Sequence, residues 1–288
     1  MGKVSCVIPT MKGREAMLAK LVSTIPTEHE IIVVDDEDLL LAAKRNKGAK
    51  QAKGEYLVFI DDDNCLKECD LNYLIQRLET DETLFEIGVF GFVACYDDKK
   101  ELVADGGSKR NYLTGFTRGK NTNARIEMLS GIYCVDEVAN AFMIPRALFE
   151  EVGGFDEENF PIDLDEADIC KRIKNLGYSI VMVPQVIVYH HSQTYSRIVD
   201  FRRPLNAYTM GRNKVFFQRK HLDFFSYSIY LICFLWLTII AYSFCLLWRR
   251  RPKMLACFLW GIFDGITKSL MSSLPKSIFS KLELRKGK

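Results

Sequence analysis

Residues 55–63 read Glu-Tyr-Leu-Val-Phe-Ile-Asp-Asp-Asp, a short apolar run that ends in three consecutive acids. A run of this length, bounded by turn-forming residues, predicts a buried strand. Residues 4–10 and 31–36 have the same form and end in Pro9-Thr10 and Asp35-Asp36. All three runs are apolar without alternation, which is the pattern of strands that are covered on both faces.

The segments between these predicted strands have helical patterns. Apolar residues recur at helical spacing over 15–23, and residues 39–52 are rich in Ala, Lys and Leu and stop before Gly54. The order β-α-β-α-β predicts an α/β fold with a mostly parallel central sheet. Ligands bind beyond the carboxyl ends of the strands in such sheets, so we expect the three polar clusters on one rim.

The three acids at 61–63 predict a cation site, because adjacent carboxylates repel one another unless a cation is present. Oxygen ligands suit Mg²⁺ or Mn²⁺, and Mg²⁺ commonly shares its coordination with substrate phosphates. For Asp35-Asp36 a turn or a helix N-cap is an equally good explanation.

A second acidic cluster occupies residues 163–168 at the start of a predicted helix. Acids that complement the dipole and the free N–H groups of a helix start explain one or two of these, not four within six positions. Asp168 and Arg172 are four residues apart and are expected to pair, which leaves Asp165 and Glu166 to face a cleft. A carboxylate beside a metal-bound phosphate can act as a general base.

The segments on either side of this cluster predict further strands. Residues 85–95 predict one long strand, followed by turn-rich loops that could shape an acceptor site. Residues 179–183 and 186–189 predict two short strands, and His190-His191 follows them. One imidazole of this pair is expected to bind the same cation as the acids at 61–63.

In their order and spacing, these segments resemble family 2 glycosyltransferases, which have the GT-A type of nucleotide-sugar-binding fold. The resemblance covers about the first 220 residues. It is carried by residues 4–10, 32–36, 44–48, 52–56, 59–63, 153–157 and 165–169, together with Arg172.

The resemblance implies the role of each site residue. The implied donor site consists of Pro9, Thr10, Asp35, Asp36, Arg45, Asp61 and Asp62. Thr10 and Asp36 would contact the base and ribose, and Arg45 would lie near the base or the diphosphate. The implied ligands of Mg²⁺ or Mn²⁺ are Asp61 and Asp63, the outer acids of the family's DxD motif, and His190, with His191 as the alternative.

The resemblance also implies an inverting transfer in which a carboxylate deprotonates an acceptor hydroxyl that attacks the anomeric carbon. Glu166 matches the family's catalytic base, but its order after Asp165 reverses the family's Glu-Asp, so Asp165 remains a rival. The acceptor would be a saccharide or a lipid-linked saccharide, as in the synthesis of cell-envelope polysaccharide. The alternative is a membrane-anchored carbohydrate-binding or scaffold protein of the same fold without turnover.

The C-terminal part predicts membrane association. Residues 224–248 contain no Asp, Glu, Lys or Arg, and 25 residues at about 1.5 Å each can cross about 30 Å of hydrocarbon. The apolar stretch 254–266 is shorter and contains Asp264, which predicts an interfacial or re-entrant helix. The predicted parts are a catalytic domain, 1–205, a basic juxtamembrane segment, 206–223, a transmembrane helix, 224–248, and a basic tail, 249–288. The catalytic domain is expected to face the cytoplasm, where nucleotide sugars are available, and membrane lipid is an expected partner.

The composition excludes other classes of protein. The 39 Lys and Arg residues nearly balance the 37 Asp and Glu residues, which is unlike a basic nucleic-acid-binding protein, so no nucleic acid is expected as a partner. The nine cysteines are scattered and odd in number, which predicts reduced thiols rather than a disulfide framework.

Overall fold

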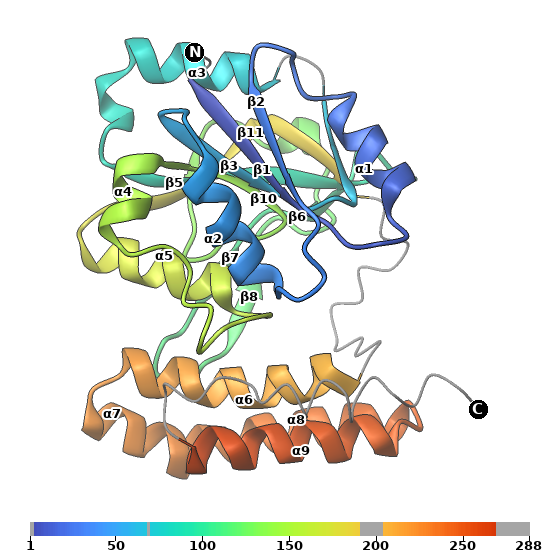
Figure 1. Ribbon diagram of the computed structural model, residues 1–288. Coiled ribbons are helices and arrows are strands. Elements are labelled where there is room, and N and C mark those ends of the chain that lie inside the picture. Colours follow the sequence, from blue (N-terminus) through green and yellow to red (C-terminus); the bar gives the residue numbers. More distant parts are fainter. Residues whose placement is uncertain (1–2, 68–69, 191–203, 269–288) are drawn as a thin grey trace. The chain divides into compact units, whose positions relative to one another are not determined.

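The computed structural model describes residues 3–67, 70–190 and 204–268 (Figure 1). The chain divides into two units. The sheet unit comprises residues 1–109, 118–155 and 166–195, and the helical unit comprises residues 110–117, 156–165 and 196–288. Two short segments of the predicted catalytic domain, 110–117 and 156–165, therefore cluster with the C-terminal helices.

The N-terminal part of the sheet unit has the predicted β-α-β-α-β order. It consists of β1 (Val4–Pro9), α1 (Glu15–Val22), β2 (Glu30–Val34), α2 (Leu41–Gln51) and β3 (Tyr56–Ile60). Strand β1 lies between β2 and β3 and is parallel to both. Since the three strands run in the same direction, their carboxyl ends meet at one edge of the sheet.

The whole sheet is mixed, so the prediction of a mostly parallel sheet is confirmed only in part. The strand order is β2-β1-β3-β10-β5-β11-β4. Strand β10 (Ala141–Pro145) lies antiparallel between β3 and β5 (Ile87–Tyr96), and β4 (Asn64–Leu66) is antiparallel to β11 (Ser179–His190). The reason is the insertion of β10, a five-residue strand that the sequence reading did not identify.

Strand β11 forms where two short strands were predicted. It is one twelve-residue strand that is parallel to β5. Its register with β5 is irregular between Val183 and Ile187, the segment that contains Pro184. Proline cannot donate to the ladder, which is why the sequence reads as two strands. The remaining strands are β6 (Val103–Asp105), β7 (Ser108–Arg110), β8 (Thr117–Gly119) and β9 (Tyr133–Cys134), and short 3₁₀ turns occupy Glu82–Leu84 and Ile126–Met128.

Helices cover both faces of the sheet. Apolar side chains of α2, α4 (Arg146–Glu151) and α5 (Asp165–Asn175) pack with one face, and those of α1 and α3 (Asp70–Thr80) pack with the other. Strand β1 contributes to both cores, because Val7 belongs to the first and Cys6 and Ile8 belong to the second. Double-sided burial agrees with the continuous apolar runs of the sequence.

Within residues 204–268, the helical unit contains four α-helices. They are α6 (Pro204–His221), α7 (Phe224–Ile229), α8 (Leu235–Trp248) and α9 (Pro252–Thr267), and the π-helical turn Tyr230–Phe234 joins α7 to α8. Of the helices in the described residues, one is long and apolar enough to cross a membrane, namely Phe224–Trp248. Helix α9 has 16 residues and a length of about 24 Å.

Candidate functional site

The polar clusters predicted to share one rim follow β1, β2 and β3 at the same edge of the sheet. Pro9 is the last residue of β1 and lies opposite Val34, the last residue of β2. The N–H of Thr10 donates to the carbonyl of Val34 at 3.0 Å, which continues the ladder by one residue. Thr10, Asp35 and Asp61 thus each begin a loop at this edge.

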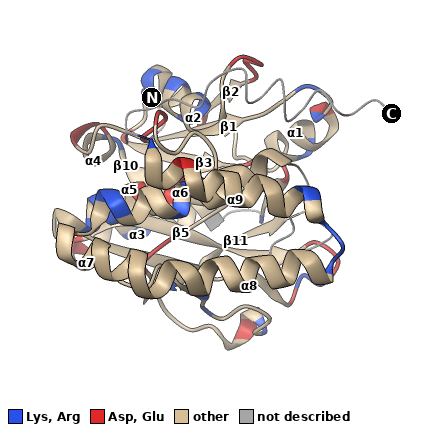
Figure 2. Ribbon diagram, turned by 90° about the horizontal axis from the view of Figure 1, so that it is seen from below, with Lys and Arg blue, Asp and Glu red and all other residues tan. Residues whose placement is uncertain are grey.

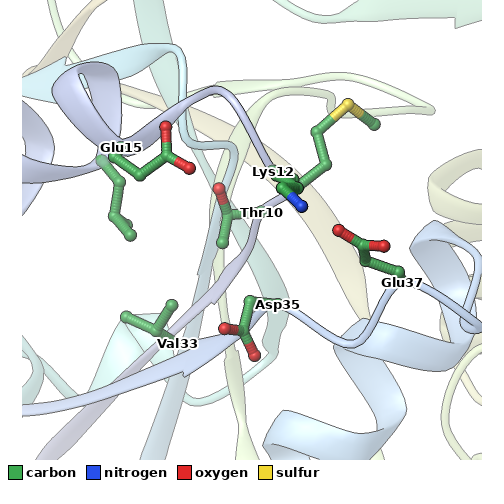
Figure 3. Close-up of a pocket in the computed structure, with 8 residues that line it drawn as sticks. Thr10, Lys12, Glu15, Val33, Asp35 and Glu37 are labelled. Atoms are coloured by element: carbon green, nitrogen blue, oxygen red, sulfur yellow. The ribbon is translucent and has the colours of Figure 1, made fainter.

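A cavity of about 280 Å³ lies between the loops that follow β1 and β2. Thr10, Lys12, Val33, Asp35 and Glu37 line it, as the close-up in Figure 3 shows. The whole lining offers a hydroxyl and three carboxylates as acceptors, an ammonium as donor and three apolar side chains. Such a mixture of apolar side chains and acceptors suits a heterocyclic ring that has N–H donors.

Asp36 and Asp62, which the sequence also assigns to the donor site, have other partners. Asp36 accepts from Lys47 Nζ at 3.0 Å, and this hydrogen bond lowers the pKa of the carboxyl below its ordinary value. Asp62 is buried and accepts from Thr10 Oγ1 at 2.7 Å and from Arg14. Asp62 therefore joins the ends of β1 and β3, and a donor contact by either acid stays a prediction.

The two predicted metal ligands Asp63 and His190 lie together, although 127 positions separate them. The antiparallel pairing of β11 with β4 places His190 opposite Asn64. As a result, Nε2 of His190 lies 3.6 Å from Oδ1 of Asp63. A carboxylate oxygen and an imidazole nitrogen are both ligands that Mn²⁺ accepts, so the pair fits the implied cation.

The remaining candidates for the cation lie differently. Asp61 accepts from Arg45 rather than facing His190, and His191 falls outside the described residues. Within 3–67, 70–190 and 204–268, no group of three His, Cys, Asp or Glu side chains converges on one point. A cation held by Asp63 and His190 would therefore take its other ligands from phosphate oxygens and water.

A buried arginine joins two of the predicted site residues. Arg45 on α2 is fully buried, and it donates from Nη2 to Asp61 Oδ1 and from Nη1 to Glu166 Oε1, both at 2.8 Å. Its guanidinium also lies 5.5 Å from the ring centroid of Phe155 and 5.8 Å from that of Phe142. A buried cation needs such partners, because an unpaired charge in this position is strongly destabilising.

Asp61 has a pKa that is raised to about 6, chiefly by desolvation, with Arg45 acting in the opposite direction. Its N–H donates to the carbonyl of Asn140 at 3.0 Å. Asn140 lies directly before β10 and has a positive φ of 65°, a conformation that asparagine tolerates better than most residues. The missed strand β10 thus begins at the site.

Asp105, at the end of β6, is a further candidate residue of this site, which the sequence analysis does not single out. It accepts from the N–H of Gly107 at 2.8 Å and from Nδ2 of Asn140 at 3.2 Å. Desolvation raises the pKa of Asp105 to about 6, and the negative charge of Glu166 acts in the same direction. The signal that could have found it is the same as for Asp61, an acid that ends a strand.

The acids at the start of α5 differ in their partners and in their burial. Asp168 is fully buried and accepts from Arg172 Nε at 2.8 Å, which confirms the predicted pair. Arg172 also donates to the carbonyls of Val152 at 2.6 Å and Gly154 at 2.7 Å. Asp165 is fully buried, whereas 16% of the Glu166 side chain is exposed.

Two comparisons of the sequence find relatives. Residues 7–223 match the family model described as Glycosyltransferase like family 2. The uncharacterized protein y4gI of Sinorhizobium fredii (strain NBRC 101917 / NGR234) is 32% identical over 53 residues, which is 18% of this chain and 6% of that protein. The match to this relative is therefore local, whereas the match to the family model covers most of the chain.

The fold is similar to that of a solved structure. The crystal structure of GalNAc-T7 with UDP, GalNAc and Mn²⁺ has a TM-score of 0.59 at 13% identity, and the match covers 94% of this chain and 58% of that chain. The mannosyltransferase PcManGT from Pyrobaculum calidifontis, in complex with GDP-Man and Mn²⁺, has a TM-score of 0.48 at 14% identity, covering 99% and 81%. The chain thus spans little more than half of the GalNAc-T7 chain, and at this identity the likeness to GalNAc-T7 concerns the fold.

Proposed function

Because the chain belongs to glycosyltransferase-like family 2, we propose that it transfers a glycosyl group from a nucleotide sugar to a hydroxyl of an acceptor. The observation that carries the proposal is the pair of hydrogen bonds from Arg45. They join Asp61, at the end of β3, to Glu166, in the first turn of α5. One fully buried cation thus holds together an acid of the proposed donor site and the proposed base.

The donor would bind along the rim that begins at the cavity beside Thr10 and Asp35. In this proposal the heterocyclic base of the donor nucleotide enters the cavity, and the diphosphate extends toward Asp61 and Asp63. Arg45 is enclosed, so it acts on the donor by holding Asp61 rather than by direct contact. The likeness in fold to a structure that holds UDP and Mn²⁺ supports a nucleotide-sugar donor.

Asp63 and His190 would hold the divalent cation, Mg²⁺ or Mn²⁺, with Asp61 nearby as a contact of the ribose or of the ion. The ion would supply positive charge beside the departing nucleoside diphosphate. The buried position of His190 on a paired strand keeps its Nε2 directed at the Asp63 carboxylate.

Glu166 is the proposed general base of an inverting transfer. Its carboxylate takes the proton of the acceptor hydroxyl, the oxygen forms a bond to the anomeric carbon, and the bond from this carbon to the diphosphate oxygen breaks. Arg45 holds one carboxylate oxygen of Glu166 at 2.8 Å, and the partial exposure of the side chain leaves access for an acceptor. Since Asp165 is fully buried, Glu166 is the better placed of the two rivals.

The apolar helix Phe224–Trp248 is long enough to cross a membrane, which supports a membrane location. We propose that the catalytic residues are on the cytoplasmic side, where nucleotide sugars are available. A membrane location in turn favours an acceptor that is itself at the membrane, such as a lipid-linked saccharide, or a cell-envelope polysaccharide.

A donor screen tests the proposal. Purified full-length protein is incubated with a panel of nucleotide sugars and Mg²⁺ or Mn²⁺, with and without chelator, and release of nucleoside diphosphate is measured. One donor is expected to give release that the chelator and Glu166→Gln both suppress. A folded protein that binds saccharides but releases nothing from any donor would instead be a scaffold of the same fold.

A further inference from the structure

The helices of the C-terminal hairpin, Phe224–Trp248 and α9, have an exposed face made of apolar side chains. On the first helix the large exposed side chains are Phe224, Phe225, Ile232, Trp236, Leu237, Ile240, Phe244, Leu247 and Trp248. On α9 they are Leu259, Trp260, Phe263 and Ile266. Both sets recur every three to four residues, so each forms one stripe along its helix.

The two stripes belong to neighbouring helices. The rings of Tyr242 on α8 and Phe258 on α9 stack with centroids 4.9 Å apart. Figure 2 shows α8 and α9 side by side, uncharged over most of their length, with Lys and Arg near the turn that joins them. This turn contains Arg249, Arg250 and Arg251, and Lys253 follows. An apolar face of two helices therefore ends in a cluster of cations.

On its other side, α9 packs closely on α6 through glycines. A β-carbon at Gly211 would overlap the carbonyl oxygen of Phe258, and one at Gly261 would overlap that of Tyr208. At Gly265 it would lie 2.9 Å from the carbonyl oxygen of Arg212. Small residues spaced in this way let two helix backbones touch along their length. Helices α6 and α9 are thus held side by side as one body.

Helix α6 is bound by polar contacts to the segment 156–165. Arg212 is buried and donates to the carbonyl of Asn159 at 2.7 Å, and Asn213 Nδ2 donates to the carbonyls of Ile162 at 2.7 Å and Asp163 at 2.8 Å. Lys220 forms an ion pair with Asp156 at 2.7 Å. These charged groups and main-chain carbonyls suit contact with a polar layer, not a hydrocarbon one.

These contacts favour a hairpin that lies flat in a bilayer over a hairpin that crosses it. If Phe224–Trp248 crossed the membrane, α9 would return through it, because only a short turn joins the two helices. Helix α6 lies against α9 from Tyr208 to Val215, so it would be drawn to the same depth with Arg212, Asn213 and Lys214. Charged and polar side chains at that depth are costly. A hairpin that lies flat avoids this cost.

The position of Trp236 also favours a hairpin that lies flat. It is the middle residue of Phe224–Trp248, and 60% of its surface is exposed. Tryptophan prefers the interface between headgroups and hydrocarbon, but a crossing helix would place Trp236 at the centre of the bilayer. In a hairpin that lies in the membrane plane, Trp236, Trp248 and Trp260 would all be at the interface.

We propose that Phe224–Trp248 and α9 lie flat in the cytoplasmic leaflet, with their apolar stripes in the lipid and without crossing the membrane. The proposal rests on the membrane association proposed above and refines it. The occupant of the apolar face is a bilayer that carries anionic headgroups, because Arg249, Arg250, Arg251 and Lys253 gather where the hairpin turns.

A protease test of sidedness separates the flat hairpin from a crossing one. One cleavage site is inserted between Arg250 and Arg251, in the turn, and a second between the exposed residues Lys99 and Lys100 of the sheet unit. Both sites are in the same full-length chain, so every molecule reports its own orientation in sealed membrane vesicles from expressing cells. A flat hairpin gives chains cut at both sites or at neither. Chains cut at one site only, with the second cut appearing after detergent, would overturn the proposal.

A flotation test examines the occupant. Full-length protein is mixed with vesicles of phosphatidylcholine, alone or with phosphatidylglycerol, and the fraction that floats is measured. Phe244→Glu and Phe263→Glu are expected to reduce flotation about tenfold or more, because a charge replaces buried apolar area. The matched control is Phe85→Glu, since Phe85 is equally exposed but belongs to the sheet unit. Arg250→Gln is expected to weaken only the preference for phosphatidylglycerol.

Two results would contradict the lipid as occupant. The first is equal flotation of Phe244→Glu and Phe85→Glu. The second is a stable dimer in lipid-free buffer that Phe244→Glu converts to a monomer, which would make a second copy of the chain the occupant. Release of nucleoside diphosphate is measured on the same samples, so turnover without flotation would refute the flat hairpin alone, and flotation without turnover would refute the transferase alone.

Discussion

Arg45 on α2 donates a hydrogen bond to Glu166 on α5 at 2.8 Å, across 121 positions of sequence. Because the same guanidinium binds Asp61, the proposed base and an acid of the proposed donor site share one positive charge. The orientation of the Glu166 carboxylate therefore depends on that of the Asp61 carboxylate, and the reverse, because both bind the same guanidinium. Four predictions follow from this site, and each can be checked on the full-length protein.

Glu166→Gln is expected to lower the rate of transfer by about two to four orders of magnitude, the usual contribution of a general base. The amide has nearly the same shape and can still meet Arg45, so the melting temperature is expected to change little. Release of nucleoside diphosphate and thermal unfolding check the two expectations. Asp165→Asn is the control, and a greater loss of transfer in this control than in Glu166→Gln would move the base to Asp165.

Arg45→Ala is expected to lower both activity and stability. It leaves Asp61 and Glu166 without their shared cation, and breaking such a buried pair costs about 3–5 kcal/mol of unfolding free energy. Chemical denaturation measures this change. Lys50→Ala is the matched control, because Lys50 is an exposed cation on the same helix, and it is expected to leave stability within about 0.5 kcal/mol of the parent. Equal stability of the two variants would contradict the structural role of Arg45.

Asp105→Asn is expected to change how stability depends on pH. The folded-state pKa of Asp105 is about 6, above the unfolded value of about 4, so the folded state binds the proton more tightly. This group therefore favours folding at low pH, and its contribution is lost as the pH rises from about 4 to about 6. Asparagine does not ionise, so the variant does not lose this contribution. The unfolding free energy of the variant minus that of the parent is expected to increase by about 1–2 kcal/mol as the pH rises from about 4 to about 6.

Denaturation midpoints of the parent and of Asp105→Asn, measured at pH 4 and pH 7, check this expectation. Asp61 titrates in the same range and remains in both proteins, so the difference between them, not either curve alone, reports on Asp105. A difference that does not vary with pH would mean that the pKa of Asp105 is the same in the folded and unfolded states.

Asp63→Asn and His190→Ala are each expected to weaken Mn²⁺ binding about 10- to 100-fold, since each removes a ligand or its orienting partner. Titration with Mn²⁺, followed by its magnetic resonance signal, measures the affinity without reference to turnover. Asp62→Asn is the informative contrast, because Asp62 binds Thr10 and Arg14. This variant is expected to lower the melting temperature and to leave the Mn²⁺ affinity unchanged. The reverse pattern would assign the ion to Asp62.

The local part of this site is readable from the sequence, and the part that depends on distant pairing is not. Strands β1 to β3 and the acids that end them follow from apolar runs and turn residues, and the pair of Asp168 and Arg172 follows from helical spacing. Strand β10 has five residues and is antiparallel to its neighbours β3 and β5. No local pattern in the sequence predicts that it inserts between them. The mixed sheet was missed for that reason.

Arg45 and Asp105 illustrate the same limit. Arg45 was expected to meet the donor, but its partner Glu166 is far away in sequence, and only the packing of α2 near α5 shows that the arginine is enclosed. Asp105 precedes two glycines and reads as an ordinary turn acid. Its perturbed pKa arises from burial and from Glu166, neither of which is visible in its neighbours along the chain.

The contacts of α6 with the segment before α5 bear on how this protein can be divided. Asp163 and Leu164 both have positive φ, at 63° and 65°, which costs free energy for residues other than glycine. Thr209 binds the Asp163 carboxylate at 2.5 Å, and Asn213 binds the main chain of the same residue. Glu166 follows two positions after this strained pair. A chain cut before Pro204 would lack both holding residues. We therefore expect that a soluble form obtained by trimming the apolar helices has to retain α6.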